Sequence, residues 1–104
     1  MSIAIATEVL DGCVLGLLAH ADDYGYALTQ QVQAVLPVSE STMYPVLRRL
    51  NKMLWVTTYD RPVDGRNRRY YAITDLGQEQ LAKIRHDWHH YRSAVDHLLT
   101  APTD

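Results

Sequence analysis

Basic side chains gather in one stretch of this 104-residue chain, between residues 48 and 69. Seven of the ten lysines and arginines fall there against two acids, so the stretch carries +5 while the whole chain carries −2. Such a cluster can bind phosphate groups, but it is also typical of a solvated surface. Which of the two applies depends on the helices and strands that carry the cations. The cations are Arg48, Arg49, Lys52, Arg61, Arg66, Arg68 and Arg69.

Histidines near the C-terminus suggest a second chemistry. The run from His86 to His90, HDWHH, is similar to the zinc-protease motif H-E-x-x-H, with two histidines one helical turn apart. An aspartate replaces the glutamate base, only two carboxylates follow, and the histidines fall on the outer side of the helix expected there. We therefore expect no metal site, no cofactor and no enzyme activity. Adventitious metal binding or a response to pH at His86 and His90 stays open.

Composition indicates one compact domain. The chain is 47% apolar, no basic stretch followed by an apolar one resembles a signal peptide, and no apolar run approaches the roughly 20 residues that span a membrane. A single cysteine, Cys13, excludes a disulfide framework and is expected in the core. These features predict a cytoplasmic protein without membrane contact.

Helical spacing of apolar residues predicts three helices in the first half of the chain. The first ends near His20, the second is capped by Asp22 or Asp23 and ends before Pro37, and the third runs from the N-cap Ser39 to about Met53. The apolar stripe of the first helix is Ile3, Ala6, Leu10, Cys13, Val14, Leu17 and Leu18, and that of the third is Met43, Leu47, Leu50 and Leu54.

After the third helix, the sequence pattern changes from the helical period to the two-residue period of a β-strand. Residues 55–60 and 69–73 are rich in β-branched and aromatic types, and Pro62, Asp64 and Gly65 between them predict a hairpin with a long basic loop. Thr74 caps a last helix that continues to about Leu99. Three helices followed by a hairpin predict a mainly α fold with a small β-hairpin wing, a winged helix-turn-helix, over residues 1–73.

The outer face of the third helix is small, polar and basic, which suits a helix that enters a DNA groove. Opposite its apolar stripe lie Ser41, Thr42, Pro45, Arg49 and Lys52, with Arg48 beside them. Arg66 and Arg68 in the expected wing loop add cations on the same side, where they can follow the DNA backbone.

Apolar residues of the last helix recur every three and four residues, which is the a/d pattern of a helix seam. We expect residues 74–104 to dimerise through it; the alternative is that the seam folds back on its own domain. Trp88 and Tyr91, with first-helix side chains, could also line a cleft for a flat aromatic effector. The seam is Leu81, Ile84, Trp88, Tyr91, Val95 and Leu98.

Three ordered blocks of this sequence resemble the PadR family of bacterial transcriptional regulators. They are YGYAL at residues 24–28, SESTMYPVLRRL at 39–50 and GRNRRYYAITDLG at 65–77. The resemblance implies a winged-helix dimer that represses genes at a pseudo-palindromic operator and is released by a small ligand. The short single C-terminal helix is similar to the compact branch of the family. By the same match, Tyr44 and the small residues before it lie at the DNA.

Two positions depart from the family pattern. Leu54 stands where a glycine usually follows the recognition helix, so a left-handed backbone there would cost roughly 1–2 kcal/mol. Asn67 replaces a proline often found in the wing. Neither change removes a cation from the expected DNA-facing surface.

The prediction is therefore a homodimeric regulator that binds double-stranded DNA and has no catalytic activity. The alternative is a winged-helix module whose basic face binds an acidic protein. The residues expected to contact DNA are Ser39, Ser41, Thr42, Tyr44, Pro45, Arg48, Arg49, Lys52, Arg66 and Arg68.

Overall fold

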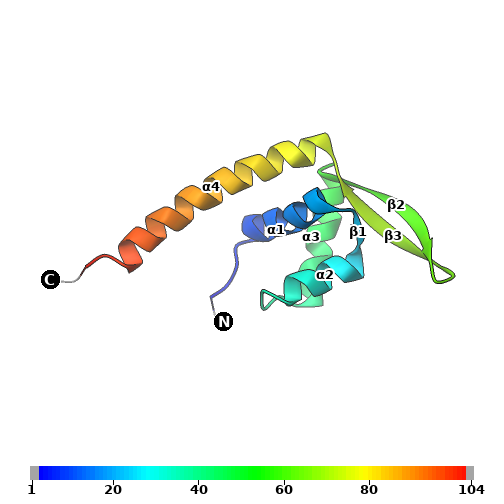
Figure 1. The fold of residues 1–104 in the computed structure, drawn as a ribbon, viewed down its shortest axis with the longest axis horizontal. Helices are drawn as coiled ribbons and strands as arrows, with labels where there is room; N and C mark the ends of the chain where they lie inside the picture. The colour runs from blue at the N-terminus through cyan, green and yellow to red at the C-terminus, as the bar shows by residue number, and fades with distance from the viewer. Residues whose placement is uncertain (1–2, 103–104) are drawn as a thin grey trace.

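The chain folds into three short helices, a small sheet and one long helix. A computed structural model describes residues 3–102. The order is α1 (Thr7–His20), β1 (Asp23–Tyr24), α2 (Gly25–Gln33), α3 (Glu40–Lys52), β2 (Val56–Val63), β3 (Arg66–Ile73) and α4 (Asp75–Leu99). The hairpin β2–β3 projects from one end of the molecule and α4 runs out beyond the other, giving extents of 64 × 28 × 21 Å (Figure 1). The expected mainly α winged-helix fold is confirmed.

One apolar core joins α1, α2 and α3 with residues from the sheet and α4. Leu10, Val14 and Leu18 of α1 are buried at the expected spacing of four. Ile3 was expected in the same stripe, but α1 begins only at Thr7 and Ile3 is 82% exposed. The prediction was wrong there because the apolar pattern runs past the N-terminus of the helix.

Helix α3 begins as its sequence predicts. The Ser39 hydroxyl caps the helix by accepting a hydrogen bond from the Thr42 backbone N–H at 3.2 Å. Pro45 lies inside α3, where it removes one backbone hydrogen bond without ending the helix.

The C-terminus of α3 has the two hydrogen bonds of a Schellman motif. The N–H of Leu54 donates to Asn51 O at 3.1 Å, and the N–H of Trp55 donates to Leu50 O at 3.0 Å. Leu54 accordingly adopts the left-handed conformation, with φ of 62°. Its side chain is 67% exposed, so its expected place in the buried stripe is wrong: the left-handed turn directs it away from the core.

The hairpin is tighter than expected. Strands β2 and β3 pair from Val56↔Ile73 to Val63↔Arg66, so only Asp64 and Gly65 lie between them. Both have positive φ, 51° and 77°, as a type I′ turn requires. The predicted long basic loop is therefore wrong. Pro62 lies within β2 instead, at the edge of the sheet, where a residue without an N–H is tolerated.

A third strand was not foreseen. Asp23 and Tyr24 form β1, which pairs with β3 as Asp23↔Tyr71 and Tyr24↔Tyr70. Helix α2 then begins at Gly25 with no side-chain cap, because Asp23 is held in the sheet and accepts from the Tyr24 N–H instead. The predicted capping role of Asp22 or Asp23 is wrong.

Helix α4 is capped by Thr74, as expected, through the Gly77 N–H at 3.0 Å. Its first turns pack on α1: Leu81 is buried and Ile84 packs against the core. Farther along, Trp88 is 41% and Tyr91 63% exposed. The near half of the seam therefore folds back on its own domain, whereas the far half is exposed and its role in dimerisation stays a prediction. Over residues 3–102, no helix has the length and apolar character needed to cross a membrane.

Candidate nucleic-acid interface

The solvent-facing side of α3 begins with three hydroxyls. Ser39 Oγ lies 2.9 Å from Ser41 Oγ and 3.0 Å from Thr42 Oγ1, and all three side chains are exposed. This arrangement leaves a small, polar surface at the front of the helix, which allows close approach by a ligand. The remaining exposed residues of this face are Tyr44, Pro45, Arg48 and Lys52.

Arg49 does not share that face. Its guanidinium Nη2 donates to Oδ1 of Asp11, a carboxylate on α1 whose side chain is only 8% exposed. Burial raises the pKa of Asp11, while the hydrogen bond and charge of Arg49 lower it. The expected outward placement of Arg49 was wrong because its long side chain bends back from the rim of the helix to reach a buried charge. An acid within the apolar stripe of the first helix was the signal that could have revealed this pair.

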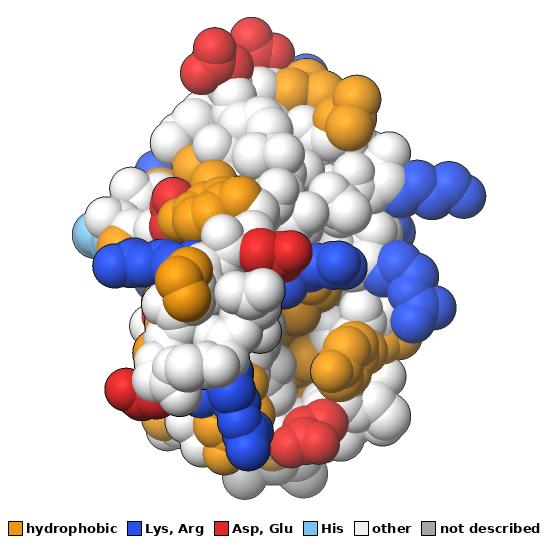
Figure 2. All heavy atoms as spheres, turned by 90° about the vertical axis from the view of Figure 1, so that its right-hand side faces the viewer, with side chains coloured by type: hydrophobic (Ala, Val, Ile, Leu, Met, Phe, Trp, Pro, Cys, Tyr) orange, Lys and Arg blue, Asp and Glu red, His pale blue; other side chains and the backbone are white. Residues whose placement is uncertain are grey.

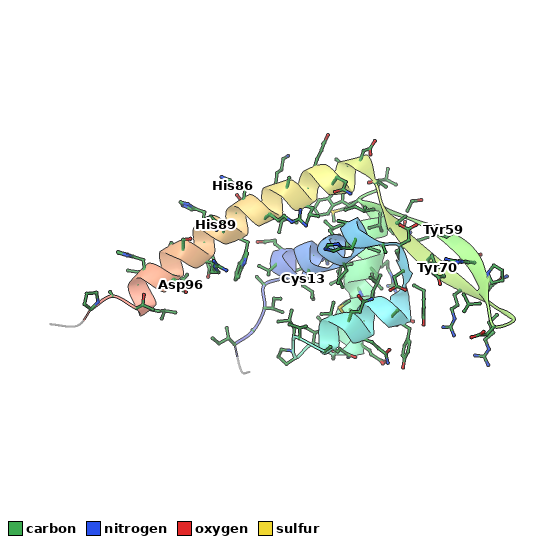
Figure 3. All side chains as sticks on the ribbon, in the orientation of Figure 1. Cys13, Tyr59, Tyr70, His86, His89 and Asp96 are labelled. Carbon is green, nitrogen blue, oxygen red and sulfur yellow. The ribbon has the colours of Figure 1, made fainter. Side chains whose placement is uncertain are left out.

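Aromatic rings hold the wing arginines. The Arg68 guanidinium lies 4.6 Å from the centroid of the Tyr24 ring, and that of Arg61 lies 5.4 Å from the ring of Tyr70. Tyr59 and Tyr70 stack across the two strands with centroids 5.6 Å apart (Figure 3). Arg68 is therefore anchored in a strand rather than carried on a mobile loop, while Arg66 is exposed beside the turn.

These tyrosines and Arg61 were absent from the predicted site. Their signal lay in the register: Tyr59 faces Tyr70 and Arg61 faces Arg68 across the hairpin. The expected loop between residues 60 and 69 hid the pair Arg61–Arg68, whereas Tyr59 and Tyr70 already lay in the two expected strands.

A hollow of about 610 Å³ lies between α2, α3 and the hairpin. Its basic residues are Arg68 and Arg69, and its acids are Glu40 and Asp60. Figure 2 views this end of the molecule and shows lysine and arginine side chains projecting across it, with acidic side chains among them. The tyrosines and amide that complete the lining include Tyr24, Tyr26, Tyr44, Asn67 and Tyr71.

A second hollow, of about 690 Å³, lies between α1 and α4. Trp88 and Tyr91 line it together, with ring centroids 6.2 Å apart. Cys13 faces it from α1, and burial raises the pKa of its thiol. Other lining residues are Ile5, Val9, Gly12, Leu81, Ile84 and Val95.

The histidines of α4 lie far from the hairpin (Figure 3). His86 Nδ1 is 3.3 Å from Asp87 Oδ1, and both side chains are exposed. Within residues 3–102, no three side chains of His, Cys, Asp or Glu come together as a metal ion would need.

The fold and the site define the class of the protein: three helices, of which the third is exposed, polar and basic, and a basic wing are the parts of a winged-helix DNA-binding protein. The chain matches the Transcriptional regulator PadR-like family over residues 14–83, and it belongs to that family. It is accordingly a transcriptional regulator and not an enzyme.

Individual proteins similar to this chain include transcriptional regulators. The transcriptional regulator Rv3488 of Mycobacterium tuberculosis is 39% identical over 75 residues, which cover 68% of this chain and 70% of the relative. The structure of a PadR-like transcriptional regulator from Bacillus cereus is similar with a TM-score of 0.80 and 34% identity, covering 90% of this chain and 94% of the other. A protein structure from Streptococcus mutans is similar over 100% of this chain and 98% of its own, with a TM-score of 0.91 and 28% identity.

Proposed function

We propose that this regulator acts as a homodimer that represses genes by binding a pseudo-palindromic operator and is released by a small aromatic effector. In this proposal residues 1–73 bind DNA, residues 74–104 dimerise, and the protein works in the cytoplasm. The observation that carries it is that Tyr44 of α3 and Arg68 of the wing line one hollow, beside the exposed polar and basic face of α3.

Helix α3 supplies the sequence-reading contacts. The front of α3 carries the exposed hydroxyls of Ser39, Ser41 and Thr42 next to the exposed Glu40, and these small hydroxyl side chains let the backbone approach base edges in a major groove. Arg48 is exposed and is suited to bind a guanine with two parallel hydrogen bonds. Ser39, Ser41, Thr42, Tyr44, Pro45 and Lys52 complete this contact surface.

The wing supplies positioning contacts. Arg66 is exposed beside the turn, and Arg68, two residues farther along β3, is held over the Tyr24 ring. Cations at two heights along one rigid hairpin are suited to successive phosphates of a DNA strand. Contacts of this kind raise affinity for all sequences and set the register of the protein on the duplex.

Dimerisation uses the open half of α4. Trp88, Tyr91 and Leu98 are exposed on it, and isolated proteins rarely leave such an apolar stretch uncovered. Leu81 is already 2% exposed within its own protomer, so the interface lies farther along the helix than the complete seam suggested. Val95 borders the hollow between α1 and α4 and completes the interface, whereas Ile84 packs against the core of its own protomer.

The effector enters the hollow between α1 and α4. Its walls are mostly apolar, and Trp88 and Tyr91 offer aromatic faces to a flat ligand. A ligand that wedges between these rings and α1 changes the interface on which DNA binding by two protomers depends.

Fluorescence anisotropy with a duplex from the region upstream of the regulator's own gene tests the proposal. Affinity should fall steeply with salt, and Arg48→Ala should lose about tenfold or more in specific binding. Lys83→Ala is the matched control, because it removes an exposed cation from α4 and should leave affinity unchanged. Binding that is equally strong for an unrelated duplex would favour a protein partner for the basic face.

A further inference from the structure

We propose that Arg49 and Asp11 form a clamp that fixes the rotation of α3 on α1, and that Arg49 acts on DNA recognition by positioning α3 without touching DNA. The inference rests on the proposed reading of DNA by α3. It removes Arg49 from the contact surface and assigns it and Asp11 a role in specificity.

The two residues form an ion pair that is closed to most of the solvent. The side chain of Asp11 is 8% exposed and that of Arg49 is 35% exposed. In the described part of the chain, Arg49 is the hydrogen-bond partner of the Asp11 carboxylate. A buried carboxylate without a partner is costly, so Arg49 is held in this position and is not free to reach a DNA groove.

The other contacts of α3 with the core are apolar. Met43, Val46, Leu47 and Leu50 bury one side of the helix, but apolar contact has no direction and tolerates a small rotation or slide. A charge-assisted hydrogen bond has a fixed geometry. The pair therefore determines which way the exposed side of α3 faces.

The position of the clamp along α3 matters as well. Pro45 interrupts the backbone hydrogen bonding between the front of the helix and its second half. Arg49 lies in that second half, directly after Arg48, which points outward. When Arg49 is held against α1, Arg48 is therefore oriented toward the DNA.

Neutralising Asp11 distinguishes the clamp from direct contact of Arg49 with DNA, because the two hypotheses predict opposite changes in affinity. Loss of the Asp11 carboxylate removes a negative charge, so simple electrostatics predicts tighter binding to polyanionic DNA. If Arg49 contacts DNA, freeing it from Asp11 should also strengthen binding. The clamp predicts the opposite result, because α3 loses its fixed orientation.

The test compares Asp11→Asn, Arg49→Gln and the double variant with the wild type. The probe is a duplex that the wild-type protein enriches from a randomised pool, measured beside a shuffled duplex of equal length. Glu8→Gln is the matched control, since it removes an exposed acid from the same helix. Melting curves confirm that each protein is folded at the assay temperature. The double variant leaves no unpaired buried charge, so it keeps the test available if a single variant does not fold.

In each single variant, the ratio of affinity for the enriched duplex to affinity for the shuffled duplex should fall about tenfold. The ratio of the double variant should fall no further than that of the more impaired single variant. The slope of log K against log salt should stay unchanged for Arg49→Gln. Glu8→Gln should bind as well as the wild type or slightly better.

The clamp is overturned if Asp11→Asn binds as tightly as the wild type or tighter, or if Arg49→Gln lowers the salt slope by about one unit, as loss of a phosphate contact does. If the wild type enriches no sequence at all, the proposed function itself fails. A failure of the clamp alone is thus recognisable, because the wild type then still selects a sequence.

Discussion

Ile84 of α4 lies directly against Gly12 of α1: a Cβ on Gly12 would come within 2.5 Å of the Ile84 Cγ2 atom. Only a residue without a side chain allows the two helices to approach this closely. This contact holds the near half of α4 on its own protomer and leaves the far half, from Trp88 onward, available to a partner.

Gly12→Ala should lower the free energy of unfolding by about 1–2 kcal/mol, although alanine is the better helix former, because Ile84 or the whole of α4 must move. Gly16→Ala is the control on the same helix. Apart from the adjacent residues and the backbone of α1 itself, no described atom lies within 4 Å of a Cβ at Gly16. Gly16→Ala should therefore raise the free energy of unfolding by about 0.5–1 kcal/mol. Urea unfolding of both variants decides the matter; equal effects would refute the close contact.

Leu54→Gly should stabilise the protein by about 1 kcal/mol, because it relieves the left-handed strain after α3 while little packing is lost from an exposed side chain. Leu54→Ala removes the same side chain but keeps a Cβ, so it should bring no such gain. Thermal unfolding measures both. A Leu54→Gly protein that melts below the wild type would contradict the strain argument.

Trp88→Asp should shift the proposed dimer strongly toward monomer, because burial of a large aromatic side chain at an interface contributes several kcal/mol. His89→Asp places the same charge on the neighbouring exposed position and should leave assembly nearly unchanged. Sedimentation at micromolar concentration distinguishes the two. A wild-type protein that sediments as a monomer would overturn the dimer.

Arg66→Ala should weaken binding to all duplexes similarly and reduce the salt slope by about one unit. Arg68→Ala should do the same and also destabilise the fold by about 0.5–1 kcal/mol, since it removes a cation from the face of the Tyr24 ring. Anisotropy titrations at several salt concentrations, with a melting curve for each protein, check both. An altered base preference with an unchanged slope would show that the wing reads bases.

The sequence predicted the parts of the fold that depend on near neighbours. Ser39 and Thr74 cap their helices within three residues of themselves, so composition and period were sufficient to locate α3 and α4. Strand β1 could not be found in this way, because Asp23 and Tyr24 become a strand only by pairing with residues almost fifty positions later.

In the candidate site, too, the features set by near neighbours could be predicted, and those set by distant residues could not. The outward residues of α3 follow from helical geometry, but Arg49 lies at the rim of the helix, and the period alone cannot decide which way it turns. Asp11, 38 residues earlier, decides it. Tyr24 likewise holds Arg68 across the sheet, and this contact depends on a strand that the sequence pattern did not reveal.

The central claim is that two copies of α3 read successive major grooves on one side of the duplex. Affinity for the enriched pseudo-palindrome should therefore depend on half-site spacing, with centres about 34 Å apart. Inserting about five base pairs places one half-site on the opposite face and should weaken binding at least tenfold, whereas inserting about ten should restore much of it. Arg48→Ala should relax the preference at one base pair of each half-site. Affinity that is unchanged by the half-turn insertion and by Arg48→Ala would contradict the claim.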